Sequence, residues 1–314
     1  MATCAPLPPP RQRPPQAALL ADGRRLHLQD GPIDLIIEAN GEPDAVDAAY
    51  GDAARRLDGL LDRLCAELPA LRAAATPAGC PVSGPVARRM WQAVAPFARD
   101  GFITPMAAVA GAVAQEVLAA FDRPGILRAY VNNGGDIALH LPAGARFTVG
   151  LVDRPDTPRL IGTTTIGADG PVRGVATSGW RGRSFSLGIA DAATILAPTA
   201  AMADAAATVI ANAVDLPGHP GIVRQPACEL QPDSDLGDRP VTRHVPVLTP
   251  AERAQALGRG LACARDLADR GLICAAALHL QGETVGTDPV LAPLVLTTAP
   301  APLPQEPERE YAHA

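Results

Sequence analysis

The stretch AMADAAATVIANAV, residues 201–214, combines the composition of a buried helix with three regularly spaced polar side chains. Asp204, Thr208 and Asn212 follow one another at intervals of four residues, so on an α-helix they would form one polar track. Two interpretations are open. In one, Thr199 caps the helix, Asp204 gains a little from the helix dipole and the rest of the track faces water. In the other, the track binds a ligand.

The composition of the chain predicts a compact protein with a core of small side chains. The 314 residues are 47% hydrophobic but only 3% aromatic, and alanine is very abundant. A chain of this length buries a substantial core, in one large domain or two small ones. We therefore expect tightly packed small and branched aliphatic residues.

The charged residues exclude several classes of partner and mechanism. The net charge is −6 and the basic residues are dispersed, so neither a nucleic acid nor an anionic membrane is an expected partner. All 27 basic residues are arginine, and the chain contains no lysine. A phosphate loop of the Walker type and a Schiff-base lysine are therefore both excluded.

The cysteines and the N-terminal residues predict a cytoplasmic location. The six cysteines are far apart and form no metal-binding spacing, which is typical of reduced thiols. The first residues lack the apolar segment of a signal peptide, and no run of about 18 apolar residues could span a membrane.

Pro-rich segments at both ends of the chain predict a single folded domain between two tails. We expect disorder over residues 1–20 and 291–314, and one domain over residues 21–290. Within the domain the pattern predicts two strands joined by an Asp30–Gly31 turn. Helices are expected over 44–68, 85–98, from Pro105 onward, at the opening stretch, and over 250–271. Strands are expected over 128–131, 136–141, 146–152, 159–166, 174–178, 184–188, 191–197 and 272–280. The predicted fold class is α+β, with helices packed on a mostly antiparallel sheet.

Three further segments carry residues that could bind a ligand. In the first, Asn133, Gly134, Gly135 and Asp136 form either an ordinary hairpin turn or a place where the backbone approaches a ligand closely. The second is the loop 174–186, which is either a solvated hairpin loop or a site for phosphate or carboxylate. Its candidate residues are Thr177, Ser178, Gly179, Arg181, Arg183 and Ser184.

The third segment begins at Thr104 and continues as a helix of small residues. Small side chains allow either close packing against another helix or contact with a flat ligand ring. No serine hydrolase elbow or HExxH zinc motif occurs, and the six histidines are scattered. We therefore expect no histidine-based catalyst and no zinc site.

The order of four motifs resembles the ApbE-like superfamily, whose characterised members are FAD:protein FMN transferases. The motifs are PMAAVAG (105–111), NNGGDI (132–137), VATSG (175–179) and ADAAAT (203–208). The segment SFSLGIADA (184–192) is similar to an uncharacterised, cytoplasmic branch of the same superfamily. This resemblance implies an ApbE-like architecture, related to the T-fold.

The resemblance also implies a metal site. In the transferases the matching helix supplies an Asp and a Thr to Mg²⁺, together with a backbone carbonyl from the small-residue helix. Here the ligands would be Asp204, Thr208 and the carbonyl near Val109. Mg²⁺ prefers such hard oxygen ligands and leaves positions for substrate phosphates. Asp191 is the candidate for a second metal ligand or a base.

Two departures from the transferase pattern bear on the activity. The transferases carry a lysine where this chain has Ala110, and a histidine-containing segment where this chain has residues 184–199. The implied cofactors are Mg²⁺ and FAD, and the implied partner is a phosphorylated small molecule such as a flavin nucleotide. Three hypotheses remain: an enzyme acting at a pyrophosphate, a protein that binds a flavin or related ligand without turnover, and a vestigial site. An Ala-rich, weakly charged surface is compatible with a homodimer.

Overall fold

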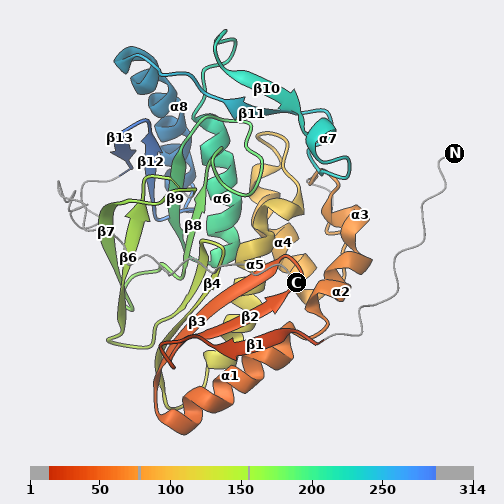
Figure 1. Cartoon of the computed structure of the whole chain (residues 1–314), viewed down its shortest axis with the longest axis vertical. Coiled ribbons are helices and arrows are strands. Elements are labelled where there is room, and N and C mark those ends of the chain that lie inside the picture. The colour runs from red at the N-terminus through yellow and green to blue at the C-terminus, as the bar shows by residue number, and fades with distance from the viewer. Residues whose placement is uncertain (1–13, 77–78, 155, 288–314) are drawn as a thin grey trace, which may run out of the picture.

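The computed structural model is built on one nine-stranded sheet that begins near residue 16 and ends near residue 286 (Figure 1). It describes residues 14–76, 79–154 and 156–287. The strand order is β1-β2-β3-β4-β5-β8-β9-β12-β13, and every neighbouring pair is antiparallel. These strands are β1 (Gln16–Leu19), β2 (Leu26–Asp30), β3 (Ile33–Gly41), β4 (Ile126–Asn133), β5 (Asp136–His140), β8 (Gly174–Ser178), β9 (Ala192–Ala197), β12 (Ala275–Leu280) and β13 (Glu283–Gly286).

The helices cover one face of this sheet. The strand residues that face them, such as Leu35, Val131 and Ile195, belong to one core cluster with the buried faces of α5 and α6. This arrangement confirms the predicted α+β class. The helices are α1 (Pro43–Leu57), α2 (Leu60–Ala66), α3 (Leu68–Leu71), α4 (Pro85–Val94), α5 (Val109–Leu118), α6 (Ala200–Ala213), α7 (Ala227–Leu230) and α8 (Pro250–Asp269), with short 3-10 turns η1 (Ala95–Phe97), η2 (Pro105–Ala108) and η3 (Ala119–Phe121).

Two small sheets complete the fold. The hairpin of β6 (Arg146–Val152) and β7 (Leu160–Gly167) packs on the opposite face of the large sheet, where a second apolar cluster includes Leu139, Val175 and Ile166. The pair β10 (Val223–Pro226) and β11 (Pro240–His244) lies with α7 at the end of the molecule opposite α1 (Figure 1).

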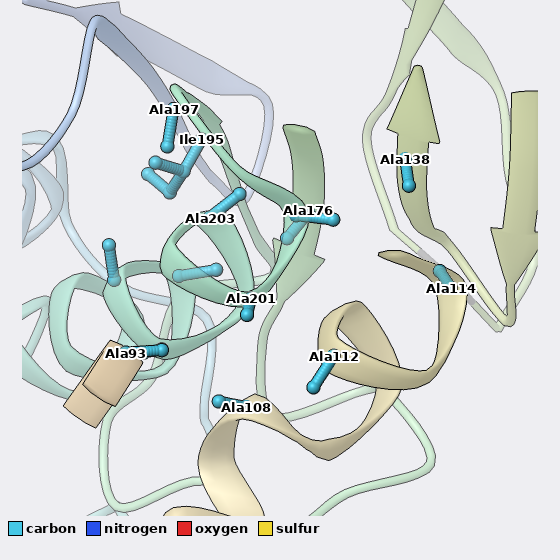
Figure 2. Packing of buried hydrophobic residues seen from close by; sticks show 14 of the residues in the cluster. Ala93, Ala108, Ala112, Ala114, Ala138, Ala176, Ile195, Ala197, Ala201 and Ala203 are labelled. Atoms are coloured by element: carbon cyan, nitrogen blue, oxygen red, sulfur yellow. The ribbon is translucent and has the colours of Figure 1, made fainter. Parts of the chain in front are cut away.

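The core around α5 and α6 is made largely of alanine, as the composition predicted. Ala112 and Ala114 on α5 and Ala201 and Ala203 on α6 are all buried in the core that these helices share with the sheet (Figure 2). A methyl side chain keeps neighbouring backbones close, so polar groups on these helices can reach one another.

Three glycines bring α6 even closer to its neighbours. A Cβ at Gly111 would lie 2.3 Å from the carbonyl oxygen of Ala200, and one at Gly174 would lie 2.3 Å from the backbone of Thr199. At the other end of α6, a Cβ at Gly188 would lie 2.1 Å from the carbonyl oxygen of Ala211. The side chain of Thr199 accepts the N–H of Met202 (3.2 Å), as the capping hypothesis required.

Some local predictions were wrong. The helix expected over 44–68 is broken at Gly59, whose φ of +63° is left-handed and ends the helical path. The strand expected over 184–188 is an irregular loop, because its backbone forms isolated bonds to the Asn212 side chain and to Thr242 rather than a strand ladder. The tail 1–20 ends earlier than expected, since residues 16–19 pair with β2 as β1. Residues 1–13 and 288–314 lie outside the described residues.

No helix in the described ranges combines the length and the apolarity that crossing a membrane requires. The five cysteines of those ranges are free, as expected.

Replacing Gly258 with alanine should stabilise the protein. Gly258 is exposed on α8, and a Cβ placed there meets no atom within 4 Å. Glycine in a helix interior costs about 1 kcal/mol relative to alanine because it loses more backbone entropy. Urea denaturation followed by circular dichroism should show a gain of roughly 0.5–1 kcal/mol in the free energy of unfolding. A loss of stability would mean that another part of the protein covers this face of α8.

Candidate functional site

The carboxylate of Asp204 is held at the N-terminus of α5. Its Oδ2 accepts the backbone N–H of Gly111 at 2.9 Å. Gly111 lies in the first turn of α5, where N–H groups have no partner within the helix and the dipole favours negative charge. The close contact of Gly111 with Ala200 brings the two helices within this reach. Asp204 therefore faces α5 and the sheet.

Asp136 is the second carboxylate of the site. It begins β5, on the same face as the buried Ala138, because alternate residues of a strand share a face. Burial raises the pKa of Asp136 to about 7, although the backbone N–H of Thr177 and the charge of Arg183 both oppose this shift. Burial and the nearby charge of Asp136 together raise the pKa of Asp204 well above its usual value. Two acidic groups thus share one poorly solvated space.

The turn before Asp136 brings β4 and α5 together. The Asn133 side chain donates from Nδ2 to the carbonyl oxygen of Ala110 (3.1 Å). Gly134 and Gly135 both have positive φ, at +64° and +114°, which favours glycine. A Cβ at Gly134 would also lie 1.7 Å from Nη2 of Arg183, so the guanidinium rests directly on this turn. The carbonyl of Ala110 and the segment around Asp136 are therefore fixed next to Asp204.

Asp191 is buried and anchors the loop that carries Arg183. Its Oδ1 accepts from Trp180 Nε1 (3.1 Å) and Arg181 Nε (2.8 Å), and its Oδ2 accepts from the backbone N–H of Gln281 (2.6 Å). The Arg181 guanidinium also stacks over the Trp180 ring at 4.3 Å. Both residues have full structural roles in this arrangement. In this arrangement Asp191 anchors the loop, and its role as a second metal ligand or a base stays a prediction.

The other residues proposed from the loop 174–186 do not gather around Asp204. The hydroxyl of Thr177 pairs with that of Thr194 (2.9 Å), on the face of the sheet opposite the helices. Gly179 packs on the carbonyl of Asp191, where a Cβ would lie 2.5 Å away, and Ser184 is exposed. Ser178, half-buried at the end of β8, shares the helix-facing side with Ala176.

The polar track on α6 divides among three environments. Asp204 binds α5, and Thr208 is half-buried one turn later. The Asn212 Oδ1 accepts from Ser186 Oγ (3.2 Å) and from the backbone N–H of Leu187 (2.9 Å). The interpretation that Asn212 faces water is therefore wrong. Asp204 accepts the N–H of Gly111, and Val109, whose carbonyl the resemblance implied as a metal ligand, is the half-buried first residue of α5.

The segment 215–249, for which the sequence suggested no role, supports both sides of the site. Thr242 on β11 donates its backbone N–H to the carbonyl of Ser186 (2.8 Å) and its hydroxyl to the carbonyl of Gly188 (2.8 Å). The buried Thr104 hydroxyl donates to a carboxylate oxygen of Asp235, so it serves this contact rather than facing a ligand. No local pattern in the sequence indicates these contacts, because the paired residues are far apart along the chain.

Comparisons with known proteins point to one family. A family model described as AbpE bacteria matches residues 17–286. A UPF0280 protein of Methanopyrus kandleri is 37% identical over 180 residues, which span 57% of this chain and 69% of that protein. A UPF0280 protein of Methanosarcina acetivorans is 32% identical over 212 residues, spanning 67% and 80%. The apo crystal structure of the flavinyl transferase ApbE of Pseudomonas stutzeri matches with a TM-score of 0.46 and 14% identity, covering 88% of this chain and 95% of that one.

Proposed function

Since the chain belongs to the AbpE bacteria family, and with it to the ApbE-like superfamily, we propose that it binds Mg²⁺ and a phosphorylated, nucleotide-like ligand such as FAD. The observation that carries this proposal is the pair of carboxylates, Asp136 and Asp204. Two acidic groups, of which one raises the pKa of the other, are costly to keep charged in a poorly solvated space. A bound divalent cation removes that cost.

The donor set fits Mg²⁺. The ion commonly takes one or two carboxylates and fills its remaining positions with water and phosphate oxygens. Asp204 and Asp136 would hold it, with the Thr208 hydroxyl one turn further along α6. When bound, the ion would polarise a phosphoryl oxygen of the ligand.

Arg183 is the basic side chain best placed to accept the phosphates. Its guanidinium lies on Gly134 and its charge acts on Asp136, yet the side chain is exposed to solvent. Arginine forms strong charge-assisted bonds to phosphate oxygens. Gly135, where a Cβ would meet nothing within 4 Å, leaves the neighbouring backbone open to a ligand. The departure at Ala110 removes the lysine of the transferases, so we propose ligand binding and not flavin transfer to protein.

Binding of FAD should therefore require Mg²⁺ and the charge of Asp204. Calorimetric titration of the wild-type protein with FAD is expected to give a saturable signal with Mg²⁺ and a much weaker one in chelator. In Asp204→Asn the affinity should fall about a hundredfold, equivalent to ~2.7 kcal/mol, because the cation loses a charged ligand. The matched control is Asp169→Asn, which removes an exposed acid from the turn after β7 and should bind as the wild type does.

Two other outcomes have clear meanings. The metal site would be refuted if the wild-type protein bound FAD equally well with Mg²⁺ and in chelator, and if Asp204→Asn bound FAD as tightly as the wild type. Release of FMN and AMP from FAD, measured by chromatography over hours, would identify the protein as a pyrophosphate-cleaving enzyme rather than a binding protein.

A further inference from the structure

A cavity of about 580 Å³ lies away from the carboxylate pair, between the C-terminal half of α5 and the far ends of β4 and β5. Its volume is in the range of small-molecule sites. Asp136 and His140 are the two ends of β5, so at about 3.3 Å per residue the cavity is roughly 13 Å along the strand from the carboxylate pair. Its polar lining residues are Gln115, Asp122, Arg123, His140 and Arg173.

The guanidinium of Arg173 is a fixed cation that still has unused hydrogen-bond donors. Its Nη1 donates to the carbonyls of Gly170 and Val172 (both 2.7 Å), and its Nη2 donates to that of Ala168 (2.9 Å). These partners are neutral, so they hold the guanidinium in place without cancelling its charge. A guanidinium has five N–H donors, of which three are used here. The Nε donor and one Nη2 donor remain, which is the number that a bidentate carboxylate or phosphate takes.

Arg123, the second arginine of the lining, is already held in an ion pair, with a carboxylate that Arg55 also contacts. It bonds to the carboxylate of Asp52 and, through Nε, to the carbonyl of Ala120 (2.9 Å). An anion in the cavity would therefore be drawn to Arg173.

The second observation that points to a ligand is the unpaired side-chain oxygen of Gln115. Within the described ranges its Oε1 is the one buried side-chain oxygen or nitrogen that has no hydrogen-bond partner. Such a group costs about 1–3 kcal/mol when it stays unpaired. The same side chain lines the cavity, so its amide is a group that a ligand with a hydroxyl or amino group could contact.

His140 and Asp122 are further polar groups of the cavity lining that can bond to a ligand. Burial lowers the pKa of His140; the charge of Asp122 opposes this shift and that of Arg173 adds to it. The imidazole is therefore neutral near pH 7 and can accept one hydrogen bond and donate another. The cavity thus offers one unpaired cation beside several groups that accept hydrogen bonds.

From this arrangement we propose a second ligand site, which binds a small anion that also carries hydroxyl or amino groups. A carboxylate or phosphate would pair with Arg173, and the hydrogen-bond donors of the ligand would face Gln115, His140 and Asp122. The site is independent of the proposed metal-dependent function, because no residue of the carboxylate pair lines the cavity.

The probes that test this site share a three-carbon skeleton. Glycerol 3-phosphate and glycerate both combine an anion with hydroxyls, glycerol has no anion, and inorganic phosphate has no carbon skeleton. We would titrate each by calorimetry into the full-length protein in chelator, so that the result does not depend on Mg²⁺ or flavin. At least one of the first two should bind saturably and at least tenfold more tightly than both glycerol and phosphate, and the better one identifies the anion.

Three variants locate the binding. Arg173→Gln should weaken it at least tenfold, and Gln115→Leu severalfold. The control Arg99→Gln, which removes an exposed arginine elsewhere, should leave it unchanged. Because Arg173 also supports the loop 168–172, the thermal midpoint of each variant is measured. Gln115→Leu removes an unpaired polar group and should melt no lower than the wild type. The proposal fails if neither organic anion binds saturably, or if both Arg173→Gln and Gln115→Leu bind as the wild type does.

Discussion

Replacing Gly174 with alanine is expected to lower the free energy of unfolding by about 3 kcal/mol, the upper end of the usual cost of overpacking a core. Gly174 lies in β8, between β5 and β9, and a Cβ there would lie 2.3 Å from the backbone of both Thr199 and Ala200. These are backbone atoms of the N-terminus of α6, so no side chain can rotate away to make room. The strand or the helix must move.

Urea denaturation monitored by circular dichroism measures the effect. The matched control is Gly167→Ala at the end of β7, where a Cβ meets nothing within 4 Å and the change should stay within about 0.5 kcal/mol. Because a displaced α6 carries Asp204 with it, the folded fraction of Gly174→Ala should also bind Mg²⁺ more weakly. Equal stability of the two variants would show that α6 does not pack on β8 as described.

Replacing Asp191 with alanine is expected to cost roughly 3 kcal/mol of folding free energy, because a buried ion pair loses one partner. The substitution leaves Trp180 Nε1, Arg181 Nε and the N–H of Gln281 without their acceptor. Asp191 is only 5% exposed, so water cannot easily replace the carboxylate. The loop that carries Arg183 would loosen at the same time.

The control for this variant is Asp156→Ala. Asp156 also pairs with an arginine, Arg154, but at the surface, where such a pair contributes at most about 1 kcal/mol. Denaturation curves should therefore show a clearly larger loss of stability for Asp191→Ala than for Asp156→Ala. If Asp191→Ala kept its stability and lost only ligand binding, Asp191 would belong to the binding machinery and the anchoring role would be wrong.

Local sequence patterns were sufficient to predict most of the helices and strands. The Asp30–Gly31 turn, the capped helix after Thr199 and the strands around Asp136 and Thr177 could all be predicted, because propensity, periodicity and turn chemistry act over a few residues. The misassigned segment 184–188 shows the limit. Its alternating pattern resembles a strand, but its backbone and Ser186 bind Asn212 of α6 and Thr242 of β11 instead.

Some residues of the candidate site could also be predicted from the sequence, and others could not. Asp204, Asn133 and Arg183 could be proposed from motifs, since their chemistry is visible in the sequence. The motifs did not reveal that Asp191 and Thr104 are occupied by structural partners, or that Gln115 and Arg173 line a cavity away from the carboxylate pair. Each of these facts depends on a contact between distant segments.

The sequence by itself determined most of the helices and strands, that the core is rich in alanine, and which residue types could hold a metal or an anion. The tertiary structure alone decided that Asp136 and Asp204, which are 68 positions apart (204 − 136), share one site. The physical reason is that burial and charge coupling arise only when β5, α5 and α6 pack together. That packing depends on close approaches at Gly111 and Gly174, whose partners a local pattern does not specify.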